Sequence, residues 1–239
     1  MCGRFTLTVP EEEWVQYFQI QAVRLKFEPR YNIAPMQDIP AIISDDSGVR
    51  RAGMLRWGLV PPWSSDEKVG SKMINARAET IHEKRSFREP LLKRRCLIPA
   101  DGFYEWKRNG REKQPHRIVL NSRPLFAMAG IYESWTSSDG RTIHTCSIIT
   151  TEPNELMSDI HDRMPVILPR EAEAVWLDRS LQSIQDLLAV LRPYPASDMR
   201  AYPVHPMVGH VTQDSPGCIE EFTAPMPVPE PEAEEPTLW

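Results

Sequence analysis

The sequence predicts an α+β fold in which short, mainly antiparallel strands form the core and helices flank them. Many short apolar or alternating segments, bounded by turn residues, follow one another between residues 41 and 168. Helical periodicity is confined to the ends of the chain and one short basic segment. The regular alternation of strands with long helices that a doubly wound fold requires is absent. No repeat or linker-like composition interrupts this pattern, so we expect one domain over residues 1–222.

The first helix is predicted from Pro10, because proline suits the first turn and the following glutamates face the positive end of the helix dipole. Trp14, Val15 and Phe18 supply its apolar face. Three further helices are predicted. One begins at Pro169, and the next is capped by Ser180 and followed by leucines at helical spacing. A short basic helix is expected over Ser86–Arg95.

Strands are predicted wherever a short apolar or alternating run lies between turn residues. Arg108-Asn109-Gly110 predicts a hairpin turn between two of them. The predicted strands are Ala41–Ser44, Met54–Val60, Met73–Glu79, Cys96–Pro99, Gly102–Lys107, Arg117–Leu120, Leu125–Tyr132, Thr145–Thr151 and Pro165–Leu168.

Composition points to an ordinary globular protein, since 41% of residues are hydrophobic and 26% charged. The longest apolar run, Leu125–Tyr132, is far too short to span a bilayer. The first residues lack the basic and apolar regions of a signal peptide, so we expect a cytoplasmic protein. The four cysteines form no CxxC pair, which favours free thiols in a reducing compartment.

Charge is unevenly distributed. Residues 1–118 carry 21 Lys and Arg against 15 Asp and Glu, and the remainder carries 7 against 18. The positive part can create a local field for a polyanion, although mixing of both parts within one fold is the simpler interpretation. Residues 223–239 are rich in proline and glutamate, and we expect this tail to be disordered or extended.

Common catalytic motifs are absent: the sequence has no GxGxxG, GxxxxGK[ST], GxSxG or HExxH. His205 and His210 are close in sequence, but no cysteine pair completes a zinc site, so they are interpreted as structural or surface residues. We therefore expect neither a metal site nor a cofactor.

Cys2 is the most unusual position. If Met1 is removed, the chain begins with a 1,2-aminothiol whose α-amine has a pKa of roughly 8. This amine can condense with an aldehyde to a Schiff base, and the thiol can then close a five-membered thiazolidine. The alternative is that Cys2 is an incidental cysteine in a disordered terminus. If Cys2 is considered alone, this alternative is the simpler interpretation.

Three polar clusters interrupt apolar strands: Ile74–Glu79, Gly102–Lys107 and Ile160–Pro165. Each alone is explained by a surface strand or a satisfied core ion pair, but three together indicate a site. Arg4, two residues after Cys2, is a candidate phosphate ligand because guanidinium binds phosphate with a fork of donors.

These segments identify a resemblance that runs from residue 1 to beyond residue 165, and His205-Pro206 fits a late motif. The chain closely resembles the SRAP proteins (SOS response-associated peptidases), the abasic-site processing proteins of bacteria and eukaryotes. The matching segments are Met1–Phe5, Arg30–Pro35, Trp57–Pro61, Ile74–Glu79, Pro99–Trp106 and Ile160–Pro165.

The resemblance implies a single barrel-like domain, acting as a monomer, that binds abasic sites in single-stranded DNA or at single/double-strand junctions. It implies that the mature N-terminal cysteine forms a thiazolidine DNA–protein crosslink, which protects the lesion during the DNA damage response near the nucleoid. The family's peptidase name refers to removal of residues before the cysteine; here only Met1 precedes it, so an aminopeptidase could suffice.

Roles follow from the matched motifs. Cys2 would be the nucleophile, Glu105 the general acid/base, Asn75 an orienting amide, and His161 a proton donor to the leaving group that also assists reversal. One departure is that Ser64 follows Trp63, where some relatives have a second aromatic, which weakens a wedge role for this loop. The predicted DNA-binding residues are Arg4, Arg77, Arg163, Trp63, Trp106, Pro35 and Thr150.

Two other functions stay open from the sequence. A cysteine peptidase would use Cys2, His161 and Glu105 as nucleophile, base and orienting group. A non-catalytic single-stranded DNA-binding module would bind intact and abasic DNA alike.

Overall fold

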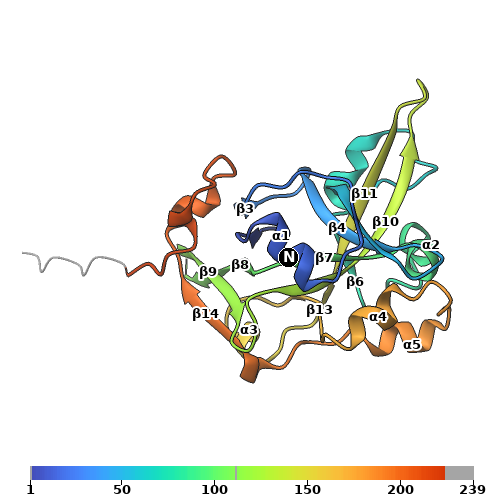
Figure 1. Cartoon of the computed structure of the whole chain (residues 1–239). Helices are drawn as coiled ribbons and strands as arrows, with labels where there is room; N and C mark the ends of the chain where they lie inside the picture. Colours follow the sequence, from blue (N-terminus) through green and yellow to red (C-terminus); the bar gives the residue numbers. More distant parts are fainter. Residues whose placement is uncertain (1, 111, 224–239) are drawn as a thin grey trace, which may run out of the picture.

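The structure is a computed structural model that describes residues 2–110 and 112–223. One of its two sheets is antiparallel and has five strands, which lie on the left of the molecule in Figure 1. β1 is its short inner strand and pairs with β8 on one side and β3 on the other. The strands, in order across this sheet, are β14 (Met199–Pro203), β9 (Glu112–Leu120), β8 (Gly102–Asn109), β1 (Phe5–Leu7) and β3 (Arg30–Ile33).

The second sheet is barrel-like. Its last long strand, β5, also pairs in parallel with β11, which closes β11, β10, β7, β4 and β5 into a ring. β6 (Asn75–Arg77) pairs in parallel with β11, and β13 (Ile167–Leu168) pairs with β10. The predicted α+β, mainly antiparallel, barrel-like fold is confirmed. The strands in order are β12 (Met164–Pro165), β11 (Thr142–Thr151), β10 (Phe126–Thr136), β7 (Arg95–Ala100), β4 (Asp38–Ser44), β5 (Arg50–Trp57) and β2 (Ala22–Val23).

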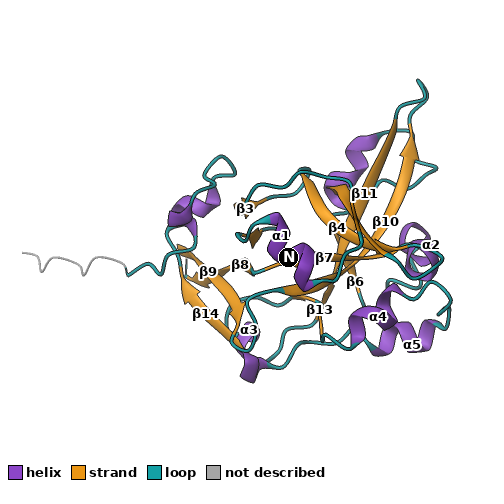
Figure 2. Cartoon of the chain, in the orientation of Figure 1, coloured by secondary structure: helices purple, strands orange, loops and turns teal. Residues whose placement is uncertain are grey.

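Short helices flank the sheets, and α2, α4 and α5 gather at the right of the molecule (Figure 2). The helices predicted at Pro10, Ser86–Arg95 and Pro169 are confirmed with shifted ends. None of the helices within residues 2–110 and 112–223 is long and apolar enough to cross a membrane. The helices are α1 (Glu11–Tyr17), α2 (Arg85–Lys93), α3 (Glu155–Ser158), α4 (Ala172–Leu177) and α5 (Ile184–Ala189).

The predicted cap of the last helix is wrong. Ser183, not Ser180, caps α5, and its hydroxyl accepts from the Asp186 backbone N–H at 3.3 Å. The Ser180 hydroxyl instead donates to the Asp178 carboxylate at 2.7 Å, so the chain turns once more before the helix begins.

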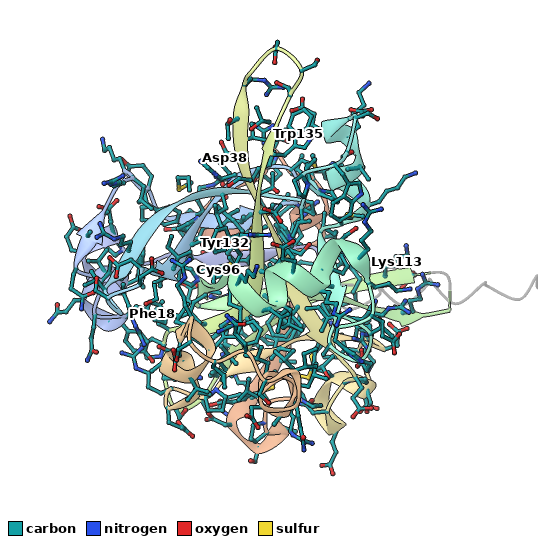
Figure 3. The ribbon with its side chains drawn as sticks, turned by 90° about the vertical axis from the view of Figure 1, so that its right-hand side faces the viewer. Phe18, Asp38, Cys96, Lys113, Tyr132 and Trp135 are labelled. Carbon is teal, nitrogen blue, oxygen red and sulfur yellow. The ribbon has the colours of Figure 1, made fainter. Side chains whose placement is uncertain are left out.

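The predicted hairpin between β8 and β9 is confirmed, with Asn109 opposite Glu112. Gly110 has a φ of +60°, a conformation that glycine adopts at little cost. The β10–β11 hairpin extends beyond the barrel (Figure 3). On it, the Trp135 indole N–H donates to the Ser64 carbonyl at 2.8 Å and ties the hairpin to the loop that carries Trp63.

The main core fills the barrel and the space between the sheets, where Phe5 packs edge-on against Trp57 at 5.4 Å between ring centres. Successive side chains of β8 point to opposite faces of its sheet. Phe103 joins the main core, whereas Tyr104 belongs to a second, smaller cluster. The alternation therefore directs Glu105 toward the main core.

All four cysteines are buried and unpaired. At the other end of the chain, the Phe222 backbone N–H donates to the Pro203 carbonyl at 2.9 Å. Residues 224–239 of the predicted tail lie outside the described residues, so the disorder expected there stays a prediction.

Candidate functional site

Cys2 lies where the N-terminal segment runs beside β8. Phe5 pairs with Phe103, and the Tyr104 backbone N–H donates to the Arg4 carbonyl at 3.0 Å. Cys2 is completely buried. Burial raises the pKa of its thiol, the nearby Glu105 charge raises it further, and the Arg4 backbone N–H, which donates to the sulfur, lowers it. In the chain that still carries Met1, the Cys2 side chain is therefore a thiol and not a thiolate at neutral pH.

Glu105 has the burial and the pKa that suit a general acid/base. Only 2% of it is exposed. Burial raises its pKa to about 7, against a hydrogen bond from the Trp106 backbone N–H that lowers it. At neutral pH its carboxyl group is populated in both protonation states, which is the condition under which one residue serves as both acid and base.

His161 follows α3 and faces Glu105, with 3.8 Å between its Nε2 and the Glu105 Oε2. Its Nδ1 accepts from the Arg163 backbone N–H at 3.1 Å and lies 2.9 Å from an Asp162 carboxylate oxygen. Burial lowers the pKa of His161, and the Asp162 charge opposes this. The imidazole is therefore mainly neutral at pH 7. Its Nδ1 lies beside both a donor, the Arg163 N–H, and an acceptor, the Asp162 carboxylate, so these contacts fit a proton on either ring nitrogen.

Asn75 approaches the same region from β6. Its amide N–H donates to the Ile148 carbonyl at 3.4 Å. Its Oδ1 is buried and has no hydrogen-bond partner within the described part of the chain. A buried acceptor without a donor is costly, so this oxygen is suited to receive a hydrogen bond from a ligand.

Two pockets border these residues. One, of about 360 Å³, is lined by Asn75, Arg77, Lys84 and Phe87 among others. The other, of about 540 Å³, is lined by Trp106, Arg108 and His161 together with the end of α3. Asn75 and His161 thus each open onto space for a substrate.

The predicted arginines differ in how they are used. Arg77 is exposed on β6. Arg163 binds both oxygens of Glu79 at 2.9 Å and donates to the Thr150 carbonyl at 2.8 Å. Arg4 donates to the Asn32 side chain and to the carbonyls of the loop at residues 208–209. Of the three, Arg77 has the side chain most open to a phosphate.

The other residues predicted to bind DNA range from exposed to buried. Trp63 is 48% exposed, and the Arg85 guanidinium stacks on its ring at 4.5 Å. Pro35 is partly buried and precedes Met36, which is 39% exposed and has a φ of +67°. Thr150 is buried.

Sequence reasoning missed Lys84, Arg85 and Arg108 as candidates for this surface. The signal for the first two was present, because they directly precede the segment predicted as a basic helix. Arg108 lies on β8, two residues after Trp106, so the alternation of side chains along this predicted strand was a signal for it.

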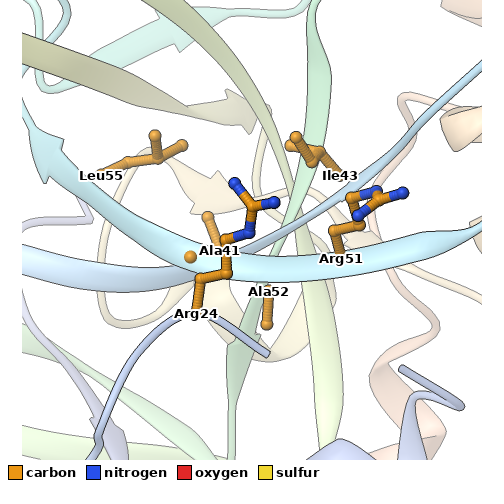
Figure 4. A pocket seen from close by; sticks show the side chains of 7 residues that line it. Arg24, Ala41, Ile43, Arg51, Ala52 and Leu55 are labelled. Carbon is orange, nitrogen blue, oxygen red and sulfur yellow. The ribbon is translucent and has the colours of Figure 1, made fainter. Parts of the chain in front are cut away.

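A separate pocket of about 460 Å³ lies over β4 and β5 (Figure 4). Ala41, Ile43 and Leu55 give it an apolar floor, and Arg24 and Arg51 stand beside it. None of the predicted site residues lines it, so it is distinct from the region around Cys2.

Comparison with known proteins identifies the family. Residues 1–211 match the family described as SOS response associated peptidase (SRAP). The chain is 52% identical to the abasic site processing protein YoqW of Bacillus subtilis, over 92% of this chain and 99% of that protein. It is 33% identical to the abasic site processing protein HMCES of Rattus norvegicus, over 92% of this chain and 75% of that protein.

A solved structure from Bacteroides thetaiotaomicron has the same fold, with a TM-score of 0.83 and 30% identity, covering 93% of this chain and all of that one. A second, from Bordetella bronchiseptica, has a TM-score of 0.75 and 28% identity, over 85% of this chain and all of that one. The chain belongs to the SOS response-associated peptidase (SRAP) family.

Proposed function

We propose that this protein processes abasic sites in single-stranded DNA by forming a covalent crosslink through Cys2, once Met1 has been removed. The observation that carries the proposal is the position of Cys2 beside Glu105, whose pKa is about 7, with His161 within 3.8 Å of that carboxylate. The curated relatives named for abasic-site processing support the same substrate.

The first step opens the sugar. An abasic deoxyribose is mostly a closed hemiacetal. The Glu105 carboxylate removes the proton of the C1′ hydroxyl. The bond between C1′ and the ring oxygen breaks, and the ring oxygen takes a proton from the imidazolium form of His161, a minor species at pH 7 that a proton from solvent restores. The product is an open-chain aldehyde, and the two residues already face one another.

The second step joins protein and DNA. The neutral α-amine of Cys2 attacks C1′, and protonated Glu105 assists departure of water to give a protonated Schiff base. The thiol then transfers its proton to the Glu105 carboxylate as its sulfur bonds to C1′, and the C=N electrons return to nitrogen. The thiazolidine forms with net release of one water molecule.

The remaining residues position the DNA. The free acceptor of Asn75 would hold a sugar hydroxyl or the α-amine. Arg77 would bind a phosphate beside the lesion, together with Arg4 and Arg163, while Trp106, Trp63 and Pro35 would contact bases or sugar and Thr150 would line the site.

The proposal is tested on a denaturing gel after the protein is mixed with single-stranded DNA. We expect a heat-stable shifted band with abasic DNA and none with undamaged DNA or with a tetrahydrofuran analogue, which has no aldehyde. Binding of all three DNAs without any crosslink would instead indicate a non-catalytic module. Turnover of unrelated peptides would indicate a peptidase.

Replacing Glu105 with glutamine should slow crosslinking by about 10²-fold or more, because the amide keeps the shape and loses proton transfer. DNA binding should be unchanged. The pH–rate profile of the wild type should inflect near pH 7, where Glu105 changes protonation state, and the variant should lose that inflection. Single-turnover gels across pH measure both, and an unchanged rate would make Glu105 a structural residue.

Replacing Arg77 with alanine should weaken DNA binding and reduce its salt dependence by one phosphate contact, which is a slope of about 0.7 in log K against log salt for a single strand. Fluorescence anisotropy over a salt series measures this. Lys26→Ala is the matched control, since its exposed ammonium lies between β2 and β3 in an ion pair with Glu28. Equal slopes for the two variants would remove Arg77 from the DNA surface.

A further inference from the structure

The Arg4 guanidinium donates hydrogen bonds to a cluster of polar groups that lie far from it in the sequence. Its Nη1 donates to the Asn32 Oδ1 at 2.9 Å and to the Val208 carbonyl, and its Nη2 donates to the Gly209 carbonyl at 3.1 Å. Its guanidinium also lies 5.9 Å from the centre of the Trp106 ring. A side chain with this many partners has one orientation.

Asn32 is the centre of this cluster. It is completely buried on β3. Its Oδ1 accepts from Arg4, and its amide N–H groups donate to the carbonyls of Val208, His210 and Gln213 at 3.1, 3.1 and 2.7 Å. One amide therefore joins Arg4 to the loop of residues 206–214, which we call the carboxy-terminal loop.

Asp214 attaches the same loop to the same strand without touching Arg4. Its Oδ1 accepts from the backbone N–H groups of Tyr31 and Asn32 at 2.6 and 3.1 Å, and its carboxylate pairs with Arg30. The loop thus has two attachments to β3, and only the one through Asn32 reaches Arg4.

The backbone of Arg4 connects this cluster to the nucleophile. Its carbonyl accepts from the Tyr104 N–H at 3.0 Å, and its N–H donates to the Cys2 sulfur. A shift of Arg4 therefore moves the thiol relative to Glu105. Residues at a chain terminus are poorly ordered unless they are tied down, and here the tie is a side chain two residues away.

We propose that Asn32 is a positioning residue for the reaction: through Arg4 and the carboxy-terminal loop, it fixes the N-terminal segment so that Cys2 meets the sugar in the reactive geometry. This inference rests on the proposed function. It gives Arg4 a role in the rate of crosslinking, in addition to any contact with phosphate.

The test separates rate from affinity. We expect Asn32→Ala to lower the single-turnover crosslinking rate constant at saturating abasic DNA, by about 10²-fold for a displacement of about 1 Å. The Kd for the tetrahydrofuran analogue should stay at the wild-type value. Asp214→Asn is the matched control, because the isosteric amide can still accept from β3, and its rate constant should remain that of the wild type.

Arg4→Lys gives a second measurement if Asn32→Ala does not fold. Lysine keeps the positive charge for phosphate, but a single ammonium cannot reach Asn32 and both loop carbonyls together. We expect its rate constant to fall and its Kd to change little. Wild-type rate constants in both folded variants, or an equal loss in Asp214→Asn, would overturn the inference. Absence of any crosslink in the wild type would instead overturn the proposed function.

Discussion

Cys2→Ala is expected to abolish the heat-stable crosslink to abasic DNA and to leave DNA binding intact. Alanine keeps the α-amine but has no sulfur, so a Schiff base cannot close to a thiazolidine. The buried methyl group replaces a buried thiol, so the fold should change little. A denaturing gel after heating measures the crosslink, and anisotropy with the tetrahydrofuran analogue measures binding.

Cys2→Ser is the matched control for this result. Its hydroxyl occupies nearly the same space but is a much poorer nucleophile than sulfur. We expect at most a heat-labile Schiff base, which borohydride reduction would trap. A thermostable adduct formed by Cys2→Ala would show that the bond lies elsewhere in the protein.

An N-terminal extension that cannot be cleaved should have an equally large effect. The extension keeps the Cys2 thiol and converts its amine into an amide, which does not condense with aldehydes. No Schiff base forms, so the thiol has no electrophile. Crosslinking should fall to background on the same gel, while DNA binding reports whether the extended chain still reaches its ligand.

A C-terminal extension is the control. The residues to which we assign a role in the reaction or in positioning Cys2 lie at or before Gln213, so extending the chain past residue 239 should leave crosslinking at the wild-type level. Robust crosslinking by protein whose intact mass includes the N-terminal extension would contradict the role of the amine.

The strands that carry the site were predictable because their patterns are strong. β8 and β9 are joined by a recognisable turn, and β10 and β11 contain long β-branched and apolar runs. The strands β2, β3 and β14 were missed. β2 has two residues, and β3 and β14 alternate polar and apolar residues only briefly, so their pairing is decided by the tertiary structure.

The candidate acid/base residue of the site could also be predicted from its residue type and position. Glu105 stands out as a carboxyl within an apolar strand, and the fold buries it as that pattern implies. The burial and partners of Arg4 and Arg163 were not predictable. Arg4 bonds to Val208, and Arg163 bonds to Glu79, across long stretches of sequence that no local pattern connects.

The intact mass of the crosslinked species tests the central claim most directly. The thiazolidine account predicts the mass of the protein without Met1, plus the abasic oligonucleotide, minus one water, with fragmentation placing the adduct on Cys2. An adduct that retains Met1, or one that maps to a lysine, would contradict it.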